Sequence, residues 1–410
     1  MPKTKTTFAK PLNTSHMHLP HREVFFKHLA QTSPDPLGLE ISHAEGVYVW
    51  DVHHRPYLDL ISGIAVSSIG HQHPKVKEAI IDQLHRYTHI MVYGETIQYP
   101  QTTYAQYLTT HLPSYLNCIY FVNSGTEAIE GAIKLAKGYT QRAEIISFEN
   151  AYHGSTHGAL SMMGNEWLKS KYRPLIPGHK ILKWMNYDEL SQITEQTAAV
   201  FIEPIQAEAG IRIPDKEYIQ ALKKHCEKTG TLLVFDEIQT GFGRTGKLFA
   251  FEHFEVIPDV LVLGKSMGGG LPIGAFIAHQ TLMQTFTHHP LGHLTTFGGN
   301  AVCVASALAT LKIILEDELH KNAVKIEQIL KETLIHPSIK EVRIKGAMAA
   351  IQLHSPEAVR HTITKSLEKG LIMDWFLFAP DCIRLAPPLI IEAHELEKGI
   401  HLLIESLDHV

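Results

Sequence analysis

The sequence of 410 residues predicts an α/β fold in which a mixed, mostly parallel sheet is covered by helices. Between about residues 100 and 300, short apolar runs alternate with longer amphipathic segments, which is the pattern of strands joined by crossover helices. The flanking segments lack this rhythm, so we expect a smaller α+β domain built from both chain ends. We assign residues 1–70 to an N-terminal segment and part of the small domain, 71–300 to the large domain, and 301–410 to a C-terminal small domain.

Each expected element follows from a local residue pattern. Residues 46–50 and 56–59 are short β-type runs on either side of a His-His-Arg turn, and they predict a hairpin. A long apolar segment from about Ala301 predicts a buried helix, and residues 392–407 predict an amphipathic one. Six apolar runs predict strands of the large sheet, at residues 118–122, 144–147, 199–202, 232–235, 260–263 and 273–277, with helices such as 128–138 and 214–229 between them.

Charge and cysteine content narrow the class of protein. The 37 basic and 42 acidic residues leave a formal charge of -5 without a basic stripe, so nucleic acid is not an expected partner. The four cysteines are far apart and include no CxxC pair, which argues against disulfides or a zinc site and favours a reducing cytoplasm. No apolar run reaches membrane-spanning length, and the first residues lack the apolar segment of a secretory signal.

The 28 histidines raise the question of a bound metal. Close pairs such as His71 and His73 lie at turns beside Gly or Pro, and no HExxH helix occurs. Histidines in such positions are more often exposed or hydrogen-bonded than metal ligands, so we expect no metal site.

Two charged residues stand at the ends of predicted strands. Lys265 follows the apolar run 260–264, and Asp236 follows the run 232–235. Because ligands of open α/β sheets bind outside the carboxyl ends of the strands, both side chains are expected to face one crevice. A desolvated lysine can form a Schiff base and a carboxylate can keep a pyridine nitrogen protonated, so the pair predicts a pyridoxal phosphate site. Taken singly, a lysine at a strand end or an aspartate capping a turn is more often structural.

The segment that follows the first strand of the large sheet suits the phosphate of that cofactor. Ser124, Gly125 and Thr126 open a helix, and the first amides of a helix have no partners within it and bind phosphate well. The alternative is an ordinary helix cap, with Glu127 favoured by the helix dipole. The lysine and aspartate pair favours the phosphate site.

Residues 241–247 imitate a nucleotide-binding loop. They match GxGxxG and begin like a P-loop, but Leu248 stands where a P-loop has the Ser or Thr that binds magnesium. Residues 236–239 also separate these glycines from the preceding strand, which a dinucleotide site does not allow. We therefore expect no nucleotide site here.

Several ordered segments together resemble the class III aminotransferases, pyridoxal phosphate-dependent enzymes of fold type I that include ornithine, acetylornithine and 4-aminobutyrate aminotransferases. The resemblance covers nearly the whole chain, and the number and order of the segments make it specific. The matching segments are residues 62–66, 70–74, 123–127, 152–154, 203–206, 236–241, 264–265, 296–300 and 384–388.

This resemblance implies a role for each residue that matches a family motif around the cofactor. Lys265 would bind the aldehyde of the cofactor and then move a proton between two carbons, and Asp236 would pair with the pyridine nitrogen. Tyr152 would stack on the ring, and Gln239 would hydrogen-bond near its phenolic oxygen. The implied cofactor-binding residues are Ser124, Gly125, Thr126, Tyr152, His153, Glu203, Asp236, Gln239, Lys265 and Thr296.

The resemblance also implies a substrate end and a partner subunit. Arg384 would bind the α-carboxylate of a substrate with its guanidinium fork. Glu208 would pair with Arg384 when an ω-amine donor brings no carboxylate to that position. In this family the site lies at a dimer interface, where Thr296 would reach the phosphate in the partner subunit, so a homodimer is expected.

One position departs from the family pattern. Many members that use 2-oxoglutarate carry an arginine directly after the aromatic-His-Gly element, whereas this chain has Ser155. Loss of a bidentate clamp should weaken binding of a dicarboxylate by several kcal/mol unless another cation, such as Arg142, replaces it. Ala207 is a smaller departure, because glycine is usual there.

We therefore expect an aminotransferase that moves an amino group from an ω-amino acid or diamine of the ornithine or acetylornithine kind to a 2-oxo acid such as 2-oxoglutarate, by a ping-pong mechanism. Small-molecule amines and 2-oxo acids are its expected partners. Two alternatives remain, an aminomutase or racemase of the same family, and a noncatalytic binding module with the same fold. A binding module has no use for Lys265, Asp236 and Arg384 together.

Overall fold

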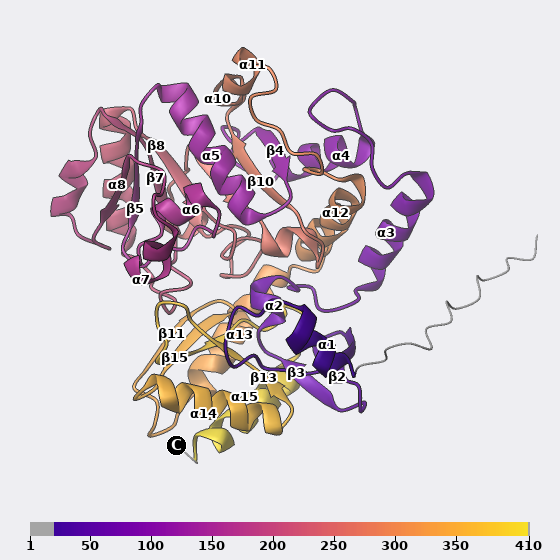
Figure 1. Cartoon of the computed structure of the whole chain (residues 1–410). Helices are drawn as coiled ribbons and strands as arrows, with labels where there is room; N and C mark the ends of the chain where they lie inside the picture. The colour runs from indigo at the N-terminus through magenta and orange to yellow at the C-terminus, as the bar shows by residue number, and fades with distance from the viewer. Residues whose placement is uncertain (1–19, 409–410) are drawn as a thin grey trace, which may run out of the picture.

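The computed structural model describes residues 20–408, with a larger part above and a smaller part below in the view of Figure 1. The larger part is built on a seven-stranded sheet of order β4-β10-β9-β8-β7-β5-β6. Within this sheet β10 alone runs antiparallel to its neighbours, so the sheet is mixed and mostly parallel, which confirms the predicted fold class. The strands are β4 (Cys118–Val122), β5 (Glu144–Phe148), β6 (His179–Leu182), β7 (Thr197–Ile202), β8 (Leu232–Asp236), β9 (Val260–Leu263) and β10 (Gly274–Ala278).

Helices cover both faces of this sheet, as Figure 1 shows. The helix expected at residues 128–138 begins earlier, at Gly125, because the Ser124 side chain caps it by accepting a hydrogen bond from the Glu127 amide. The helices of the larger part are α3 (Pro74–Arg86), α4 (Tyr99–Thr109), α5 (Gly125–Thr140), α6 (His157–Met162), α7 (Glu166–Lys169), α8 (Lys216–Thr229), α9 (Phe251–Phe254), α10 (Gln280–Met283), α11 (Thr285–His288) and α12 (Ala301–Glu316).

The central strands are buried on both faces. Every residue of β7, β8 and β9 is buried, which explains why their sequences are continuously apolar rather than alternating. Val260 and Val262 pack in the core shared with α5, while Leu261 and Leu263 pack in the core shared with α8 and α12. Successive residues of β9 therefore contact different helix layers.

The smaller part contains a sheet that joins the two ends of the described chain. The hairpin expected at residues 46–50 and 56–59 is present and forms half of a four-stranded sheet of order β1-β2-β3-β13. The last strand comes from the C-terminal region and runs parallel to its neighbour. These strands are β1 (Ile41–Glu45), β2 (Tyr48–Asp51), β3 (Pro56–Asp59) and β13 (Leu371–Ile372).

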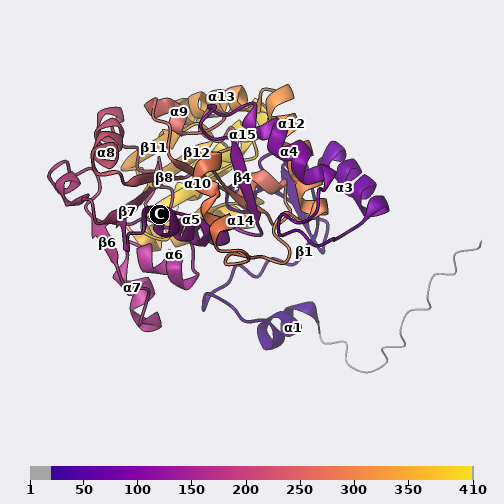
Figure 2. The same ribbon diagram turned by 90° about the horizontal axis from the view of Figure 1, so that it is seen from above.

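A second four-stranded sheet, of order β11-β12-β15-β14, completes the smaller part. The helices at residues 319–333 and 356–368 pack against it, and the helix expected at residues 392–407 begins at Ala393 and packs on those two helices. Figure 2 shows the short first helix, which buries none of its own residues, standing apart from the rest. These elements are α1 (His21–His28), α2 (Ser62–Ala65), α13 (Leu319–Thr333), α14 (Pro356–Glu368), α15 (Ala393–Leu407), β11 (Glu341–Lys345), β12 (Met348–Gln352), β14 (Asp374–Trp375) and β15 (Cys382–Leu385).

The glycine-rich segment 241–247 consists of turns and opens no helix. Arg244 at its centre is fully buried and donates hydrogen bonds to the Ser68 hydroxyl at 2.6 Å and to the backbone oxygens of Ala347 and Pro387. The segment therefore ties the larger part to the C-terminal region.

Within residues 20–408, no helix combines the length and the apolar composition needed to cross a membrane. The same residues contain no group of three or more His, Cys, Asp or Glu side chains that could hold a metal ion. All four cysteines are free.

Candidate active site

Lys265 and Asp236 face one cavity at the carboxyl end of the central sheet. Asp236 is the last residue of β8, and Lys265 follows the neighbouring parallel strand β9 after a single glycine. The cavity has a volume of about 270 Å³. Its lining residues are Gly125, Thr126, Tyr152, His153, Gly154, Ser155, Glu203, Glu208, Asp236, Ile238, Gln239, Thr240 and Lys265.

The amine of Lys265 is prepared for nucleophilic chemistry. Burial lowers its pKa to about 8, and this loss of proton affinity exceeds the opposing effect of the Glu208 and Asp236 charges. The backbone of Lys265 also adopts a left-handed conformation, with φ of 46°, which is strained for a residue with a side chain. The lowered pKa and the strained backbone thus occur together at Lys265, the residue for which the sequence predicts covalent chemistry.

His153 supports Asp236 from behind. Its Nδ1 lies 2.7 Å from Asp236 Oδ2, and the ring is fully buried. Burial lowers the pKa of His153, but the hydrogen bond and charge of Asp236 outweigh it, so the net direction is upward. Asp236 Oδ1 accepts a second hydrogen bond from the Ile238 amide at 3.0 Å. The carboxylate is therefore fixed in place, and an imidazole sits behind it.

Glu203 connects two loops of the site through hydrogen bonds. Its two carboxylate oxygens accept hydrogen bonds from the amides of Tyr152 and Ala207, each at 3.0 Å. Burial raises the pKa of Glu203 to about 7. Glu203 thus fixes both the aromatic residue at one side of the cavity and the loop that carries Glu208.

The amino end of α5 forms another wall of the cavity. A side chain at Gly125 would bring its Cβ within 2.7 Å of Ile238, so glycine is required where the helix passes the loop after β8. The Thr126 hydroxyl lies 2.8 Å from the Thr156 hydroxyl. Unpaired backbone amides at this helix end can donate hydrogen bonds to a phosphate. Ser124 does not line the cavity, because its side chain caps the helix.

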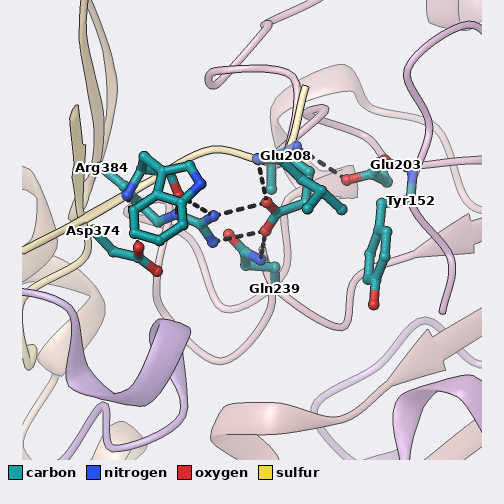
Figure 3. Close-up of polar contacts among 9 residues, drawn as sticks. Tyr152, Glu203, Glu208, Gln239, Asp374 and Arg384 are labelled. Atoms are coloured by element: carbon teal, nitrogen blue, oxygen red, sulfur yellow. Dashed lines mark hydrogen bonds and ion pairs between the residues drawn. The ribbon is translucent and has the colours of Figure 1, made fainter. Parts of the chain in front are cut away.

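A buried ion pair marks the far end of the site, as Figure 3 shows. The guanidinium of Arg384 binds both carboxylate oxygens of Glu208, each at 2.7 Å, and also donates to the Trp375 backbone oxygen at 2.6 Å. Burial raises the pKa of Glu208, but the charges of Arg384 and Lys265 together with the hydrogen bonds from Arg384 and the Leu377 amide outweigh it, so the net direction is downward. Gln239 donates a longer hydrogen bond of 3.4 Å to Glu208.

Tyr152 and Ser155 line the opposite side. Figure 3 shows Tyr152 on the side of Glu208 that faces away from Arg384. The Tyr152 hydroxyl lies 3.2 Å from the hydroxyl of Ser155, which is exposed. This side therefore presents an aromatic ring and two hydroxyl groups.

Thr296 and Arg142 do not line the cavity of the described chain. Thr296 is exposed, and its hydroxyl lies 3.3 Å from that of Tyr93. Its expected contact is with the phosphate in a partner subunit, and this stays a prediction. The suggestion that Arg142 binds a second substrate carboxylate was wrong, because its guanidinium donates hydrogen bonds to the backbone oxygens of residues 197, 229 and 230.

Sequence reasoning missed Asp374, which lies beside Arg384 in Figure 3. Its Cα is paired with that of Arg384 across β14 and β15. Burial raises the pKa of Asp374, against the opposing charge of Arg384. No motif surrounds it, and only the pairing of these short strands brings it to the site.

The residues present fit pyridoxal phosphate. A buried lysine with a lowered pKa, a fixed buried carboxylate and free helix amides border one cavity, and an aromatic ring lies beside them. These are the groups needed for its aldehyde, its pyridine nitrogen, its phosphate and its ring face.

Comparisons with known proteins agree with this chemistry. The model of the family "Aminotransferase class-III" matches residues 29–407. The acetylornithine aminotransferase of Methanopyrus kandleri is 38% identical over 88% of this chain and 92% of its own length. The [LysW]-aminoadipate semialdehyde/glutamate semialdehyde transaminase of Sulfurisphaera tokodaii is 39% identical over 88% of this chain and 93% of its own.

A solved structure extends the agreement to the fold. The ornithine aminotransferase of Toxoplasma gondii superposes with a TM-score of 0.87 and 29% identity, over 95% of this chain and 94% of that one. The chain therefore belongs to the class III aminotransferases, and it is an enzyme that depends on pyridoxal phosphate.

Proposed function

We propose that this enzyme transfers an amino group from an ω-amino acid or diamine to a 2-oxo acid by a ping-pong mechanism. The observation that carries the proposal is the buried Glu208–Arg384 pair in the same site as Lys265. The similarity to acetylornithine and ornithine aminotransferases supports a donor of that size and kind.

Pyridoxal phosphate, when bound, supplies an aldehyde for the amine and an electron sink for the reacting carbon. The Lys265 amine would hold that aldehyde and then move the proton at the reacting carbon. Asp236, fixed by His153, would keep the pyridine nitrogen protonated. Tyr152 would cover one ring face, and Gln239 would donate a hydrogen bond near the phenolic oxygen.

The phosphate would be held by the amino end of α5. Gly125 and Thr126 supply backbone amides there, Thr126 adds a hydroxyl, and Ser124 fixes the helix end through its cap. Glu203 would contribute indirectly, because it positions Tyr152 and the loop of Glu208.

In the ion pair at the far end, a substrate carboxylate would replace Glu208 as the partner of Arg384. While Glu208 neutralises Arg384, the site favours a donor that brings no carboxylate to this position. When Glu208 turns away, the guanidinium fork is free to bind the carboxylate of a 2-oxo acid in the same bidentate way. One site then serves two substrates in turn.

We also propose that the enzyme is a homodimer in which Thr296 of one subunit approaches the phosphate of the other. Segments 88–99 and 290–300 lie against each other through a hydrogen bond between the hydroxyls of Tyr93 and Thr296 and a distance of 4.9 Å between the ring centres of His89 and Phe297. Several of their apolar side chains are exposed, which fits a surface that a second copy covers. These include Ile90, Met91, Ile97, Tyr99, Leu291, Leu294 and Phe297.

The domain division proposed from the sequence, with boundaries near residues 70 and 300, is supported by the positions of the sheets. All seven strands of the large sheet fall between these boundaries, and the sheet of β11, β12, β14 and β15 follows the second one. Helix α12 also follows the second boundary, but it packs on α3 and α4 of the larger part. We propose a cytoplasmic location, to which four unpaired cysteines are suited.

The test is an absorbance spectrum between about 300 and 500 nm, recorded before and after separate additions of ornithine, acetylornithine, 4-aminobutyrate, lysine and glutamate. Loss of the visible band with one ω-amine donor, and its return on addition of a 2-oxo acid, is the expected result. If no keto acid forms, a product with its amino group on a different carbon would instead identify an aminomutase. A product with inverted configuration at the amine-bearing carbon would identify a racemase.

A further inference from the structure

The wall of the cavity that faces away from Arg384 carries hydroxyl groups and no cation among the described residues. Tyr152 and Ser155 line this wall, with their hydroxyls 3.2 Å apart, and Ser155 is exposed at its edge. Figure 3 shows Tyr152 and Arg384 on opposite sides of Glu208. A substrate that contacts both sides therefore meets a guanidinium at one end and neutral hydroxyls at the other.

Acidic side chains that line the cavity outnumber the lysines and arginines. Glu208, Asp236 and Glu203, whose pKa burial raises to about 7, contribute carboxyl groups, and Lys265 is the single lysine or arginine among the lining residues of the described chain. His153 also lines the cavity, but its Nδ1 is bound to Asp236. The cation at the far end, Arg384, is already neutralised by Glu208. A second carboxylate on a substrate would enter this environment without a cation to compensate the loss of its hydration.

Within the described residues, Arg142, the arginine considered above as a second clamp, does not reach that wall. Arg142 is held at the other end of the strands by three backbone oxygens, at 2.9 to 3.0 Å. Moving it would break three charge-assisted hydrogen bonds. Among the described residues, the Tyr152–Ser155 wall therefore presents no lysine or arginine.

We propose that the amino acceptor is a 2-oxo acid with a single carboxylate, a substrate class that rests on the transamination proposed above. Its carboxylate binds Arg384 after Glu208 turns away, and its neutral side chain points to the Tyr152–Ser155 wall. The acceptor's carbonyl carbon gains the amino nitrogen and a proton and is reduced, while the aminated carbon of the cofactor is oxidised back to the aldehyde. The carbonyl oxygen leaves as water and a water restores the aldehyde oxygen, so no outside oxidant is needed.

The experiment measures the second half-reaction alone. The holoenzyme is converted to its aminated form with an effective donor, the donor is removed, and the return of the visible band is followed after mixing with pyruvate or 2-oxoglutarate. We expect the second-order rate constant for pyruvate to exceed that for 2-oxoglutarate by about tenfold or more. Equal rate constants, or a preference for 2-oxoglutarate, would overturn the inference.

Two variants locate the preference at the Tyr152–Ser155 wall. Ser155→Arg and Ser155→Lys each place a cation there, and at least one should raise the rate constant for 2-oxoglutarate relative to that for pyruvate about tenfold. Ser191→Arg, which adds the same charge at an exposed residue of the short 3₁₀ helix Asp188–Gln192 outside the cavity, should leave the ratio unchanged. If both Ser155 variants fold with the wild-type melting temperature and neither gains 2-oxoglutarate activity, the assignment of this wall is wrong. Failure of every donor to aminate the cofactor would instead refute the proposed function.

Discussion

The cofactor end and the substrate end of the site are built in different ways. Asp236 and Lys265 sit at the ends of neighbouring parallel strands, so the buried sheet itself sets their separation. Glu208 and Arg384 are 176 residues apart and meet because a loop after β7 touches a strand of a second sheet. The first pair is held by neighbouring strands of one sheet, whereas the second is a contact between a loop and a strand, which we propose an incoming carboxylate replaces.

The largest effect is expected at the cofactor end, from Lys265→Ala. This change removes both the anchor of the cofactor and the group that moves the proton, so kcat should fall by about 10⁴-fold or more. Absorbance should still detect bound cofactor, because Asp236 and the α5 amides remain, but without the lysine-bound band. Retention of more than a hundredth of the wild-type kcat would contradict the role given to Lys265.

Asp236→Asn should have the next largest effect. The amide oxygen can still accept the hydrogen bond from His153, but the charge that keeps the pyridine nitrogen protonated is lost. We expect kcat to fall about 10²- to 10³-fold, while KM for the acceptor changes little because Arg384 is untouched. Steady-state kinetics separate the two parameters, and a change confined to KM would show that Asp236 does not act on the cofactor.

The lowered pKa of Lys265 predicts a pH dependence for uptake of the cofactor by the apoprotein. Only the neutral amine attacks an aldehyde, and its fraction rises about tenfold per pH unit below the pKa. Because burial sets that pKa at about 8, the uptake rate should rise about 50-fold from pH 6 to pH 8 and only about twofold more above it. A rate that continued to rise toward pH 10 in stopped-flow measurements would mean that Lys265 titrates like an exposed lysine.

Smaller and opposite effects are expected at the substrate end. Arg384→Lys keeps the charge but loses the fork, so KM for a 2-oxo acid should rise about tenfold or more. Glu208→Gln weakens the interaction with Arg384 and should lower that KM by a few-fold. The same change should reduce discrimination between ω-amines and α-amino acids. Separate kinetics of the two half-reactions measure both changes. If the two variants shift KM in the same direction, the substrate carboxylate does not replace Glu208 at Arg384.

The two ends also differ in how far the sequence predicts them. Asp236, Lys265 and the amino end of α5 each follow a recognisable apolar strand, so their meeting at one sheet edge follows from the fold class alone. The support that His153 gives Asp236 depends on a contact across 83 residues that no local pattern encodes. Strand β6 was also missed, since only half of its four residues are apolar.

The substrate end was predicted through the family resemblance, and its surroundings were not. Asp374 reaches Arg384 through the pairing of two short strands, and short strands leave little periodicity to detect. Arg142 was a candidate only because it is a cation near the correct sequence region, whereas the structure uses its donors to bind backbone oxygens. The role of Thr296 depends on a second subunit, and it stays a prediction.

The most direct test of the central claim is to reduce the holoenzyme with borohydride, digest it and locate the cofactor by peptide mass spectrometry. Reduction fixes the cofactor to whichever amine holds its aldehyde. The account predicts one cofactor mass per chain, carried by the peptide that contains Lys265 and absent from Lys265→Ala. Attachment to a different lysine, or no attachment in protein that shows the visible band, would contradict it.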